Sequence, residues 1–232
     1  MAKIIMFSGG IGSGKAHCMN QKIMELKETG NSICMISFAD PIKKLVAKYF
    51  GIDKNGKRLH YPMPVSLEMF VNAVASFLKA ENRYIPNDFI TTDFCDAITQ
   101  TGQDDDQERI NGARVLMQIT GTEIGQQIKK EAWPMLAVEK IKKIESVTPI
   151  DYYIIDDLRF VFEYFCFLRE FQHHHEVMPY YVHASEKTRA KRRGLTVDVL
   201  RNQSKHLSER ESAEVLLPFM RLYFPDNIIL ND

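Results

Sequence analysis

A glycine-rich loop set between a strand-like run and a helix-like run constrains this chain more than any other feature. Residues 3–7, Lys-Ile-Ile-Met-Phe, form a short apolar run with β-branched residues, and an amphipathic stretch begins at His17. Between them, Gly9, Gly14 and Lys15 fall at the spacing Gly-x-x-x-x-Gly-Lys. A strand, a glycine loop and a helix start are the context that a phosphate-binding P-loop requires. The alternative, a glycine-rich surface turn, is disfavoured because all three parts agree.

The loop residues predict contacts with the phosphates of ATP. Glycines let backbone N–H groups close around phosphate oxygens, and the positive end of the helix dipole lies at the same place. Lys15 would reach the β- and γ-phosphates. Ala16 and His17 stand where a hydroxyl normally holds Mg²⁺, so the sequence leaves magnesium placement open. The residues expected to bind ATP are Gly9, Gly10, Ile11, Gly12, Ser13, Gly14, Lys15 and Ala16.

Composition and charge exclude several functional classes. The 232 residues suffice for one α/β domain with an insertion, and the 45% apolar content is that of an ordinary globular protein. The 30 basic and 30 acidic residues balance, which argues against a dedicated nucleic-acid binder. No apolar run reaches the length of a membrane span, and the first residues lead into a core strand rather than a signal peptide. Four scattered cysteines make no metal-type pair, so we expect reduced thiols and a cytoplasmic protein.

Further strand-like runs alternate with helix-like runs along the chain. Four more runs of apolar and β-branched residues predict strands, at 32–37, 152–155, 177–183 and 227–230. A helix is expected over 41–50, with Asp40 as its N-cap. Strands separated by helices favour a mostly parallel sheet with right-handed crossovers, and therefore a three-layer α/β sandwich.

Residues 51–112 differ from this pattern and are expected to form a helical insertion. Turn signals surround one apolar helix, 67–78. Asp104–Asp106 could bind a metal ion, but consecutive carboxylates more often form a solvated loop or a helix start. His173–His175 raise the same question. Because adjacent side chains of an extended segment alternate in direction, we favour a solvated loop there too.

A second segment with phosphate-site chemistry follows the strand at 152–155. Asp156 and Asp157 end this strand, and in P-loop folds an aspartate at that position holds Mg²⁺ directly or through water. The alternative role of these carboxylates is helix capping. Arg159 comes two residues later and is suited to bidentate contact with a phosphate.

Residues 185–194, Ser-Glu-Lys-Thr-Arg-Ala-Lys-Arg-Arg-Gly, form a basic segment. In a chain of zero net charge we interpret it as part of a lid, expected over 185–210, which brings arginines over the transferred phosphoryl group and excludes water. Arg189, Arg192 and Arg193 are the candidates, and on a helix Arg189 and Arg193 share one face. A solvated basic helix and a nucleic-acid patch are the alternatives.

Residues 114–125 combine apolar and polar positions. Leu116, Ile119 and Ile124 are expected to be buried. The polar positions supply a cation, an amide, a hydroxyl and a carboxylate, which suit a monophosphate, a base edge and a sugar. They are Arg114, Gln118, Thr122 and Glu123. Taken alone, the segment predicts only a helix with a polar face.

Together these segments resemble the deoxynucleoside monophosphate kinases of bacteriophages, which are relatives of dephospho-coenzyme A kinase and other small P-loop kinases. The similar stretches are the glycine loop, Ser37-Phe38-Ala39-Asp40-Pro41-Ile42-Lys43, Arg114-x-x-x-Gln118-x-x-Gly121-Thr122-Glu123 with Trp133 further on, and Asp157-x-Arg159-Phe160-x-x-Glu163. The tail adds His206-x-Ser208-Glu209 and the closing residues 228–232. The order of these motifs is right and they span most of the chain, whereas 51–112 and 164–184 match poorly.

The resemblance implies a single P-loop kinase domain over 1–232 that transfers the γ-phosphate of ATP, with Mg²⁺, to a deoxynucleoside monophosphate in viral DNA precursor synthesis. Lys15, Arg159, Arg189 and Arg193 would be catalytic, Arg189 and Arg192 would also contact ATP, and Asp156 and Asp157 would hold the metal. The acceptor would be bound by Asp40, Lys43, Arg114, Gln118, Thr122, Glu123, Trp133 and Arg159. The expected partner is a small-molecule nucleotide, with no nucleic acid and no membrane. Since many small kinases dimerise, a homodimer is compatible with the resemblance, and a viral enzyme would act in the host cytoplasm.

Two other functions stay open at this point. A dephospho-coenzyme A kinase-like enzyme is compatible with the loop sequence, although the Phe-Ala-Asp-Pro and Arg114–Glu123 motifs favour the nucleotide kinase. A nucleotide-binding protein with impaired catalysis is compatible with Ala16-His17, because the family usually has Lys-Asp-Thr where this chain has Lys15-Ala16-His17.

Overall fold

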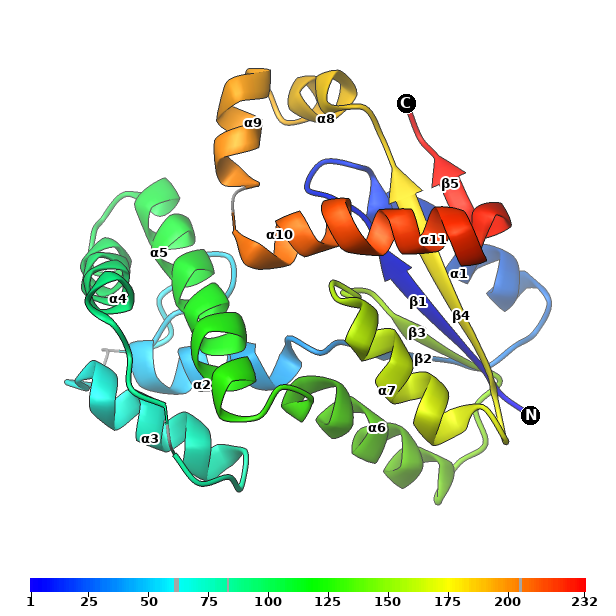
Figure 1. The fold of residues 1–232 in the computed structure, drawn as a ribbon, viewed down its shortest axis with the longest axis horizontal. Coiled ribbons are helices and arrows are strands. Elements are labelled where there is room, and N and C mark those ends of the chain that lie inside the picture. The colour runs from blue at the N-terminus through cyan, green and yellow to red at the C-terminus, as the bar shows by residue number, and fades with distance from the viewer. Residues whose placement is uncertain (61–62, 83, 205) are drawn as a thin grey trace. The chain divides into compact units, whose positions relative to one another are not determined.

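The computed structural model describes residues 1–60, 63–82, 84–204 and 206–232 and divides into two compact units (Figure 1). Met1–Phe38 and Pro134–Asp232 form one unit, here called the sheet unit. Ala39–Trp133 form the other, called the helical unit. The segment 51–112, expected to be a helical insertion, lies within the helical unit.

The sheet unit is built on five parallel strands in the order β2-β3-β1-β4-β5. The strands are β1 (Lys3–Ser8), β2 (Ile33–Ile36), β3 (Tyr152–Ile155), β4 (Glu176–His183) and β5 (Ile228–Leu230). The predicted α/β class and parallel sheet are thus confirmed. The central strand β1 is buried on both faces from Ile4 to Ser8, which is why its sequence is a continuous apolar run rather than an alternating one.

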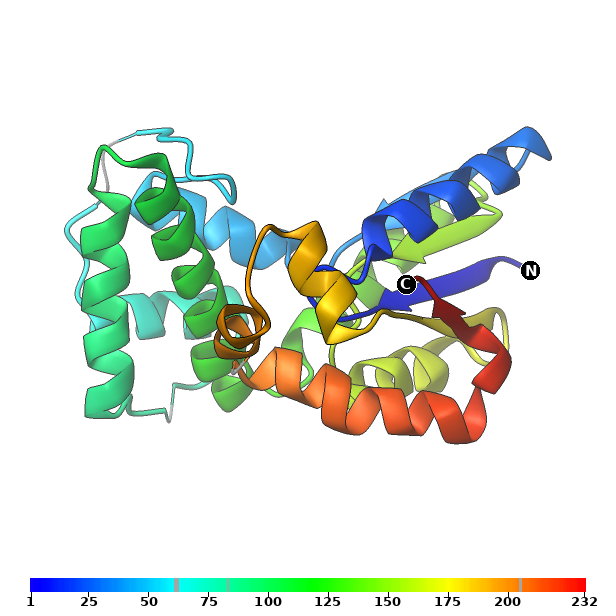
Figure 2. The ribbon, with the colours of Figure 1, turned by 90° about the horizontal axis from the view of Figure 1, so that it is seen from above.

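Helices cover both faces of this sheet. On one face, α1 (Lys15–Glu28) packs Cys18, Met19 and Leu26 against the side chains of the central strands. Figure 2 shows α7 (Val161–Phe171) and α11 (Leu217–Tyr223) on the opposite side, an arrangement compatible with a three-layer sandwich. The remaining helical segments are α6 (Ala132–Glu145), which begins in the helical unit, α8 (Glu186–Arg192), α9 (Val197–Gln203), α10 (Leu207–Glu211), η2 (Ser212–Leu216) and η3 (Pro225–Asn227).

The helical unit packs its helices around an aromatic centre. The helices are α2 (Asp40–Phe50), α3 (Leu67–Phe77), α4 (Asp88–Thr101), α5 (Asp106–Gln118) and the π-helical segment η1 (Ile119–Gln126). The rings of Phe50, Phe70 and Phe94 lie 4.9–5.8 Å apart, so helices α2, α3 and α4 share one buried cluster. The side chains of Ser66, Asn87 and Asp105 cap the starts of α3, α4 and α5 by accepting bonds from backbone amides.

Local details correct or extend the sequence predictions. Asp40 is not an N-cap, because the amide of Lys43 bonds to the carbonyl of Ala39 and the helix therefore starts one residue earlier. The Asp40 carboxylate instead pairs with the Lys43 ammonium at 3.2 Å. The acidic run Asp104–Asp106 is a helix start, as favoured. The predicted helix over 114–125 changes to a π-helix at Ile119.

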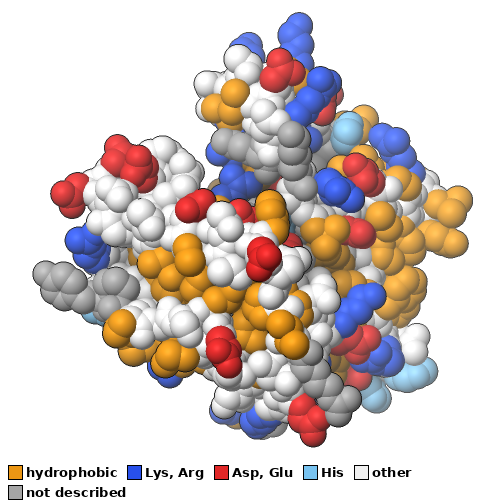
Figure 3. All heavy atoms as spheres, turned by 60° about the vertical axis from the view of Figure 1, so that its left-hand side comes forward, with side chains coloured by type: hydrophobic (Ala, Val, Ile, Leu, Met, Phe, Trp, Pro, Cys, Tyr) orange, Lys and Arg blue, Asp and Glu red, His pale blue; other side chains and the backbone are white. Residues whose placement is uncertain are grey.

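The helices and the histidine run of the described residues bear on the membrane and metal predictions. None of the helices formed by the described residues is both long and apolar enough to cross a bilayer. On the face shown in Figure 3, acidic and basic side chains are interspersed. His173 and His174 are exposed in the loop before β4, whereas His175 pairs with Glu145 at 2.8 Å. No group of three or more His, Cys, Asp or Glu side chains among the described residues is arranged to hold a metal ion.

Candidate functional site

The loop between β1 and α1 has a backbone path that only glycine follows without strain. Gly14 has φ +85°, and a Cβ atom there would lie 2.2 Å from Nδ2 of Asn231. A Cβ atom on Gly9 would lie 2.6 Å from the carbonyl oxygen of Val182 on β4. The two ends of the loop are therefore pressed against neighbouring strands and the C-terminal segment. This close packing explains why glycine occupies positions 9 and 14 of the loop.

Backbone amides gather where this loop enters α1. In the described part of the chain, the N–H groups of Gly12, Gly14, Lys15 and Ala16 donate no hydrogen bond to a protein acceptor. The first turn of α1 contains no acidic residue that would neutralise the helix dipole. Free donors and a positive dipole end at one point are an arrangement that can bind an anion.

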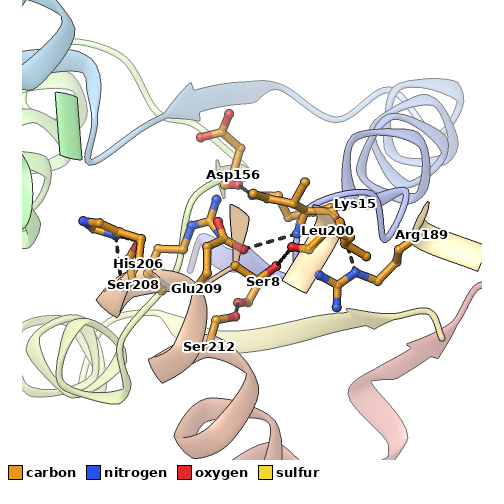
Figure 4. A network of polar contacts seen from close by, with 12 residues as sticks. Ser8, Lys15, Asp156, Arg189, Leu200, His206, Ser208, Glu209 and Ser212 are labelled. Atoms are coloured by element: carbon orange, nitrogen blue, oxygen red, sulfur yellow. Dashed lines mark hydrogen bonds and ion pairs between the residues drawn. The ribbon is translucent and has the colours of Figure 1, made fainter. Parts of the chain in front are cut away.

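Lys15 points along the loop toward the end of β3. Its ammonium donates to the backbone carbonyl of Asp156 (Figure 4). Burial, and then the nearby Arg159 guanidinium, lower the pKa of Lys15 from 10.5 to about 8. The carboxylates of Asp157, Asp156 and Glu209 act in the opposite direction. Two cations are therefore held close together beside the open amides.

A buried carboxylate connects Arg159 to the loop. Glu209 on α10 is 7% exposed, and its Oε1 accepts a bond from Nη1 of Arg159 at 2.8 Å. Its Oε2 accepts a 3.3 Å bond from the backbone N–H of Ile11. Three residues further on, Ser212 Oγ lies 3.2 Å from Ser8 Oγ at the end of β1 (Figure 4). The helical segment α10–η2 is thus attached to the loop and its strand at two points.

The basic segment expected to form a lid also contacts the loop. Arg189 Nε donates to the Ile11 carbonyl at 2.7 Å, and Arg192 Nη1 donates to the Ser13 carbonyl at 3.1 Å. Asn231 Nδ2 donates to the same Ser13 carbonyl at 2.8 Å. Helix α8 ends at Arg192, so Arg193 is an exposed C-cap residue rather than a helical neighbour of Arg189. Among the three candidate arginines, Arg189 and Arg192 thus contact the loop backbone, and Arg193 is exposed at the end of the helix.

The two aspartates after β3 have different roles in the structure. Both oxygens of Asp157 hold the segment that follows β2: one accepts from Ser37 Oγ at 2.7 Å and the other from the Phe38 amide at 2.9 Å. Asp156 contributes its backbone carbonyl to Lys15, and its Oδ1 atom is buried at the same place. The N-cap of α7 is Phe160, so neither aspartate is the N-cap residue of that helix.

One further carboxyl group lies directly beside Arg159. Glu163 is buried, and its Oε2 accepts bonds from the amides of Arg159 and Phe160 at 2.8 and 3.0 Å. Burial raises the pKa of Glu163 to about 8, against the opposing effect of these two amides. This group fixes the backbone from which the Arg159 side chain extends.

The residues expected to bind an acceptor lie in the helical unit, apart from Arg159. Arg114 and Gln118 are partly buried on α5, and Thr122 and Glu123 follow on η1. Burial and the neighbouring Asp93 raise the pKa of Glu123. Leu116, Ile119 and Ile124 are buried as predicted.

Trp133 packs inside the helical unit. Its indole N–H donates to the Gly121 carbonyl at 2.8 Å, and the side chain is 2% exposed. A Cβ atom on Gly125 would lie 2.3 Å from the indole ring, so the ring rests directly on the η1 backbone. In the structure this residue therefore packs in the interior of the helical unit.

Sequence reasoning gave no role to three residues of this site. Glu209 and Asn231 were noted only because the C-terminal segment resembles the kinase family, and Ser212 carried no signal at all. Comparison with protein-family models gave no match for this chain. Comparison with curated protein sequences gave no match either.

Proposed function

We propose that this chain is an ATP-dependent phosphotransferase of the deoxynucleoside monophosphate kinase type, with the loop of residues 9–15 acting as a P-loop. The observation that carries the proposal is the convergence of open loop amides with Lys15 and Arg159 at the start of α1. A cradle of N–H donors flanked by two cations suits a polyphosphate chain better than any neutral ligand. Arg189, on the opposite side of the loop peptide, adds a third cation beside Gly10.

In the proposed reaction, an oxygen of the acceptor monophosphate attacks the γ-phosphorus of ATP, the bond from that phosphorus to the β–γ bridging oxygen breaks, and ADP leaves. That oxygen is largely ionised at neutral pH, so no strong general base is needed, and catalysis consists of positioning and charge neutralisation. Lys15, Arg159 and Arg189 would neutralise the charge that builds up on the transferred group. Arg192, which holds the Ser13 carbonyl, would keep the loop in shape and contact ATP.

Magnesium fits the chemistry of this site. Mg²⁺ in such enzymes is held chiefly by phosphates and water, with one or two carboxylates. Both oxygens of Asp157 accept bonds from Ser37 and Phe38, so we propose that Asp156 would contribute the carboxylate. When bound, the ion would supply positive charge that offsets the negative charge of the ATP phosphates.

The acceptor residues proposed in the helical unit supply complementary chemistry. Arg114 would pair with a monophosphate, and Gln118, Thr122 and Glu123 would meet the base edge and the sugar. Asp40 and Lys43, joined by their ion pair on α2, would lie close to the acceptor. The deoxynucleotide that supports turnover would identify the base that the protein accepts.

The test is coupled ADP release with ATP and Mg²⁺ against dTMP, dGMP, dCMP, dAMP and dephospho-coenzyme A. We expect turnover with at least one deoxynucleotide and its loss in Lys15→Met. Turnover confined to dephospho-coenzyme A would assign the related coenzyme kinase activity instead. Wild-type turnover in Lys15→Met would contradict the P-loop assignment, because that variant lacks the cation that contacts the β- and γ-phosphates.

A second candidate function, nucleotide binding without turnover, is favoured by one observation. Ala16, exposed in the first turn of α1, places a methyl group where the magnesium-binding hydroxyl normally stands. Calorimetric titration with ATP separates the two functions. Binding of ATP with no ADP formed from any acceptor would assign this second function.

A further inference from the structure

We propose that Glu209 is a positioning residue of this phosphate site: its buried carboxylate holds Arg159 and the loop in the arrangement that receives the phosphates. The inference rests on the proposed function and adds a residue to it from α10, a helix distant in sequence from the loop. Glu209 makes its two bonds to exactly the two kinds of donor, a guanidinium and a loop amide, that a phosphate would use.

The placement of Glu209 is fixed from its own helix. His206 caps α10 by accepting the amide of Ser208 on Nδ1 at 3.3 Å. Glu209 and Ser212 are three residues apart, so they lie on the same side of the helical segment, and both contact the end of β1 or the loop after it. The carboxylate is therefore held at the loop by two neighbouring attachments rather than by one flexible side chain.

A carboxylate at this position leaves Arg159 able to bind a ligand. The guanidinium carries five N–H donors in a planar fork, and Glu209 receives a bond from Nη1. The Arg159 side chain remains 27% exposed, so the surrounding residues cover it only in part. Fixing one edge of the fork against a buried carboxylate orients the remaining donors in advance, which lowers the entropy lost when a phosphate binds.

Glu209 also fixes the loop itself. The N–H of Ile11 donates to Glu209, and the carbonyl of Ile11 accepts from Arg189. The two successive peptide groups that meet at Ile11 are therefore held from α10 on one side and from α8 on the other. These two hydrogen bonds at Ile11 orient the loop amides that follow it toward the start of α1.

A merely structural role is distinguished by its dependence on the Arg159 side chain. Glu209 orients the planar guanidinium fork through its bond to Nη1. Lysine at position 159 keeps the positive charge but has no planar fork for Glu209 to orient. The effect of a Glu209 substitution on ATP affinity should therefore shrink in an Arg159→Lys background, whereas a change in packing alone has no such dependence.

The experiment measures ATP affinity by calorimetry in the wild-type background and in the Arg159→Lys background. The variants are Glu209→Gln, which keeps the shape and removes the charge, and Glu209→Asp, which keeps the charge and shortens the side chain. Glu214→Gln is the matched control. Glu214 lines the same cavity of about 280 Å³ beside Gly10 and Glu209, but it is exposed and pairs only loosely with Arg210, at 4.0 Å.

We expect both Glu209 variants to bind ATP about tenfold more weakly near neutral pH, the loss that corresponds to one hydrogen bond to a charged group. In the Arg159→Lys background, Glu209→Gln should cost less affinity than in the wild-type background, because Glu209 then has no planar fork to orient. Glu214→Gln should bind ATP as tightly as wild type. Thermal melting of each variant shows whether it is folded at the assay temperature. If Glu209→Gln is not folded, the ATP affinity of Glu209→Asp tests the inference instead.

The failure of this inference differs from the failure of the proposed function. If wild-type protein does not bind ATP, the proposed function is wrong and the role of Glu209 toward phosphate falls with it. If wild-type protein binds ATP and both Glu209 variants bind it as tightly, the phosphate site stands and Glu209 has no positioning role. If Glu209→Gln weakens binding by the same factor in the wild-type and Arg159→Lys backgrounds, the role of Glu209 is structural and the inference is overturned.

Discussion

Replacing Lys15 with Met should make the folded protein more stable while it abolishes ATP binding. Burial and Arg159 lower the pKa of Lys15 from 10.5 to about 8. A shift of about 2.5 pH units corresponds to roughly 3 kcal/mol of unfolding free energy at neutral pH. The variant also loses the bond from the ammonium to the Asp156 carbonyl, and this loss reduces the gain in unfolding free energy by about 1 kcal/mol. The net expectation is a gain of about 2 kcal/mol, or a rise in Tm of about 5 °C for a chain of this size.

The pH dependence gives this prediction its sign. Between about pH 8 and pH 10.5 the unfolded chain binds a proton at Lys15 that the folded protein has released, so the unfolding free energy of wild type rises with pH across this window. Below about pH 8 both states carry the proton and the destabilisation stays constant. The advantage of Lys15→Met should therefore be full at pH 7 and should shrink as the pH approaches 10.5.

Urea unfolding followed by circular dichroism, at pH 7 and again near pH 10, measures both effects. Lys22→Met is the control, since Lys22 lies on the same helix and makes a surface pair with Glu25 at 3.2 Å. Such a pair contributes little, so the control should change the unfolding free energy by less than about 1 kcal/mol at either pH. A Lys15→Met protein less stable than wild type at pH 7, or an advantage that does not depend on pH, would refute the reasoning.

Three further changes test other parts of the structure. The unfolding free energy of wild type should fall as the pH rises from about 4.5 to about 8, because the folded protein holds a proton on Glu163 that the unfolded chain releases. Glu163→Gln should remove this pH dependence. Gly14→Ala should lower the unfolding free energy by about 2–4 kcal/mol, more than Gly30→Ala, since both residues have positive φ but only Gly14 is crowded. Gly125→Ala should cost about 1–3 kcal/mol and shift the fluorescence of Trp133, the single tryptophan, to longer wavelength.

These predictions have separate measurements and controls. Urea unfolding of wild type and Glu163→Gln at several pH values checks the first, and parallel slopes would contradict it. For the second, Gly30→Ala is the control, because nothing lies within 4 Å of a Cβ atom at Gly30. Equal losses of unfolding free energy in Gly14→Ala and Gly30→Ala would contradict the prediction that crowding against Asn231 costs stability. For the third, Gly102→Ala is the control, since its nearest neighbour lies at 3.3 Å, and unchanged emission in Gly125→Ala would contradict the packing.

Local sequence determined the elements of the fold. The strand expected at 152–155 occupies the same residues as β3, and the loop between β1 and α1 lies where the glycines place it. Central parallel strands are buried on both faces, so their sequences are continuous apolar runs that stand out against the amphipathic helices. Where several local signals competed, the sequence was less exact: Asp40 and Ala39 both precede Pro41, and only the bond from Lys43 shows which one starts the helix.

The tertiary structure decided how the candidate site is assembled. Glu209 and Asn231 are 198 and 218 residues from the loop residues that they bind, and no periodicity links segments so far apart. They meet the loop because all five strands are parallel and their carboxyl ends open at one edge of the sheet, where the segments after β1, β3, β4 and β5 come together. Sequence alone indicated which residues carry phosphate chemistry. The parallel sheet determined that a buried glutamate would hold one of the arginines against the loop, because burial and hydrogen-bond partners depend on which segments become neighbours.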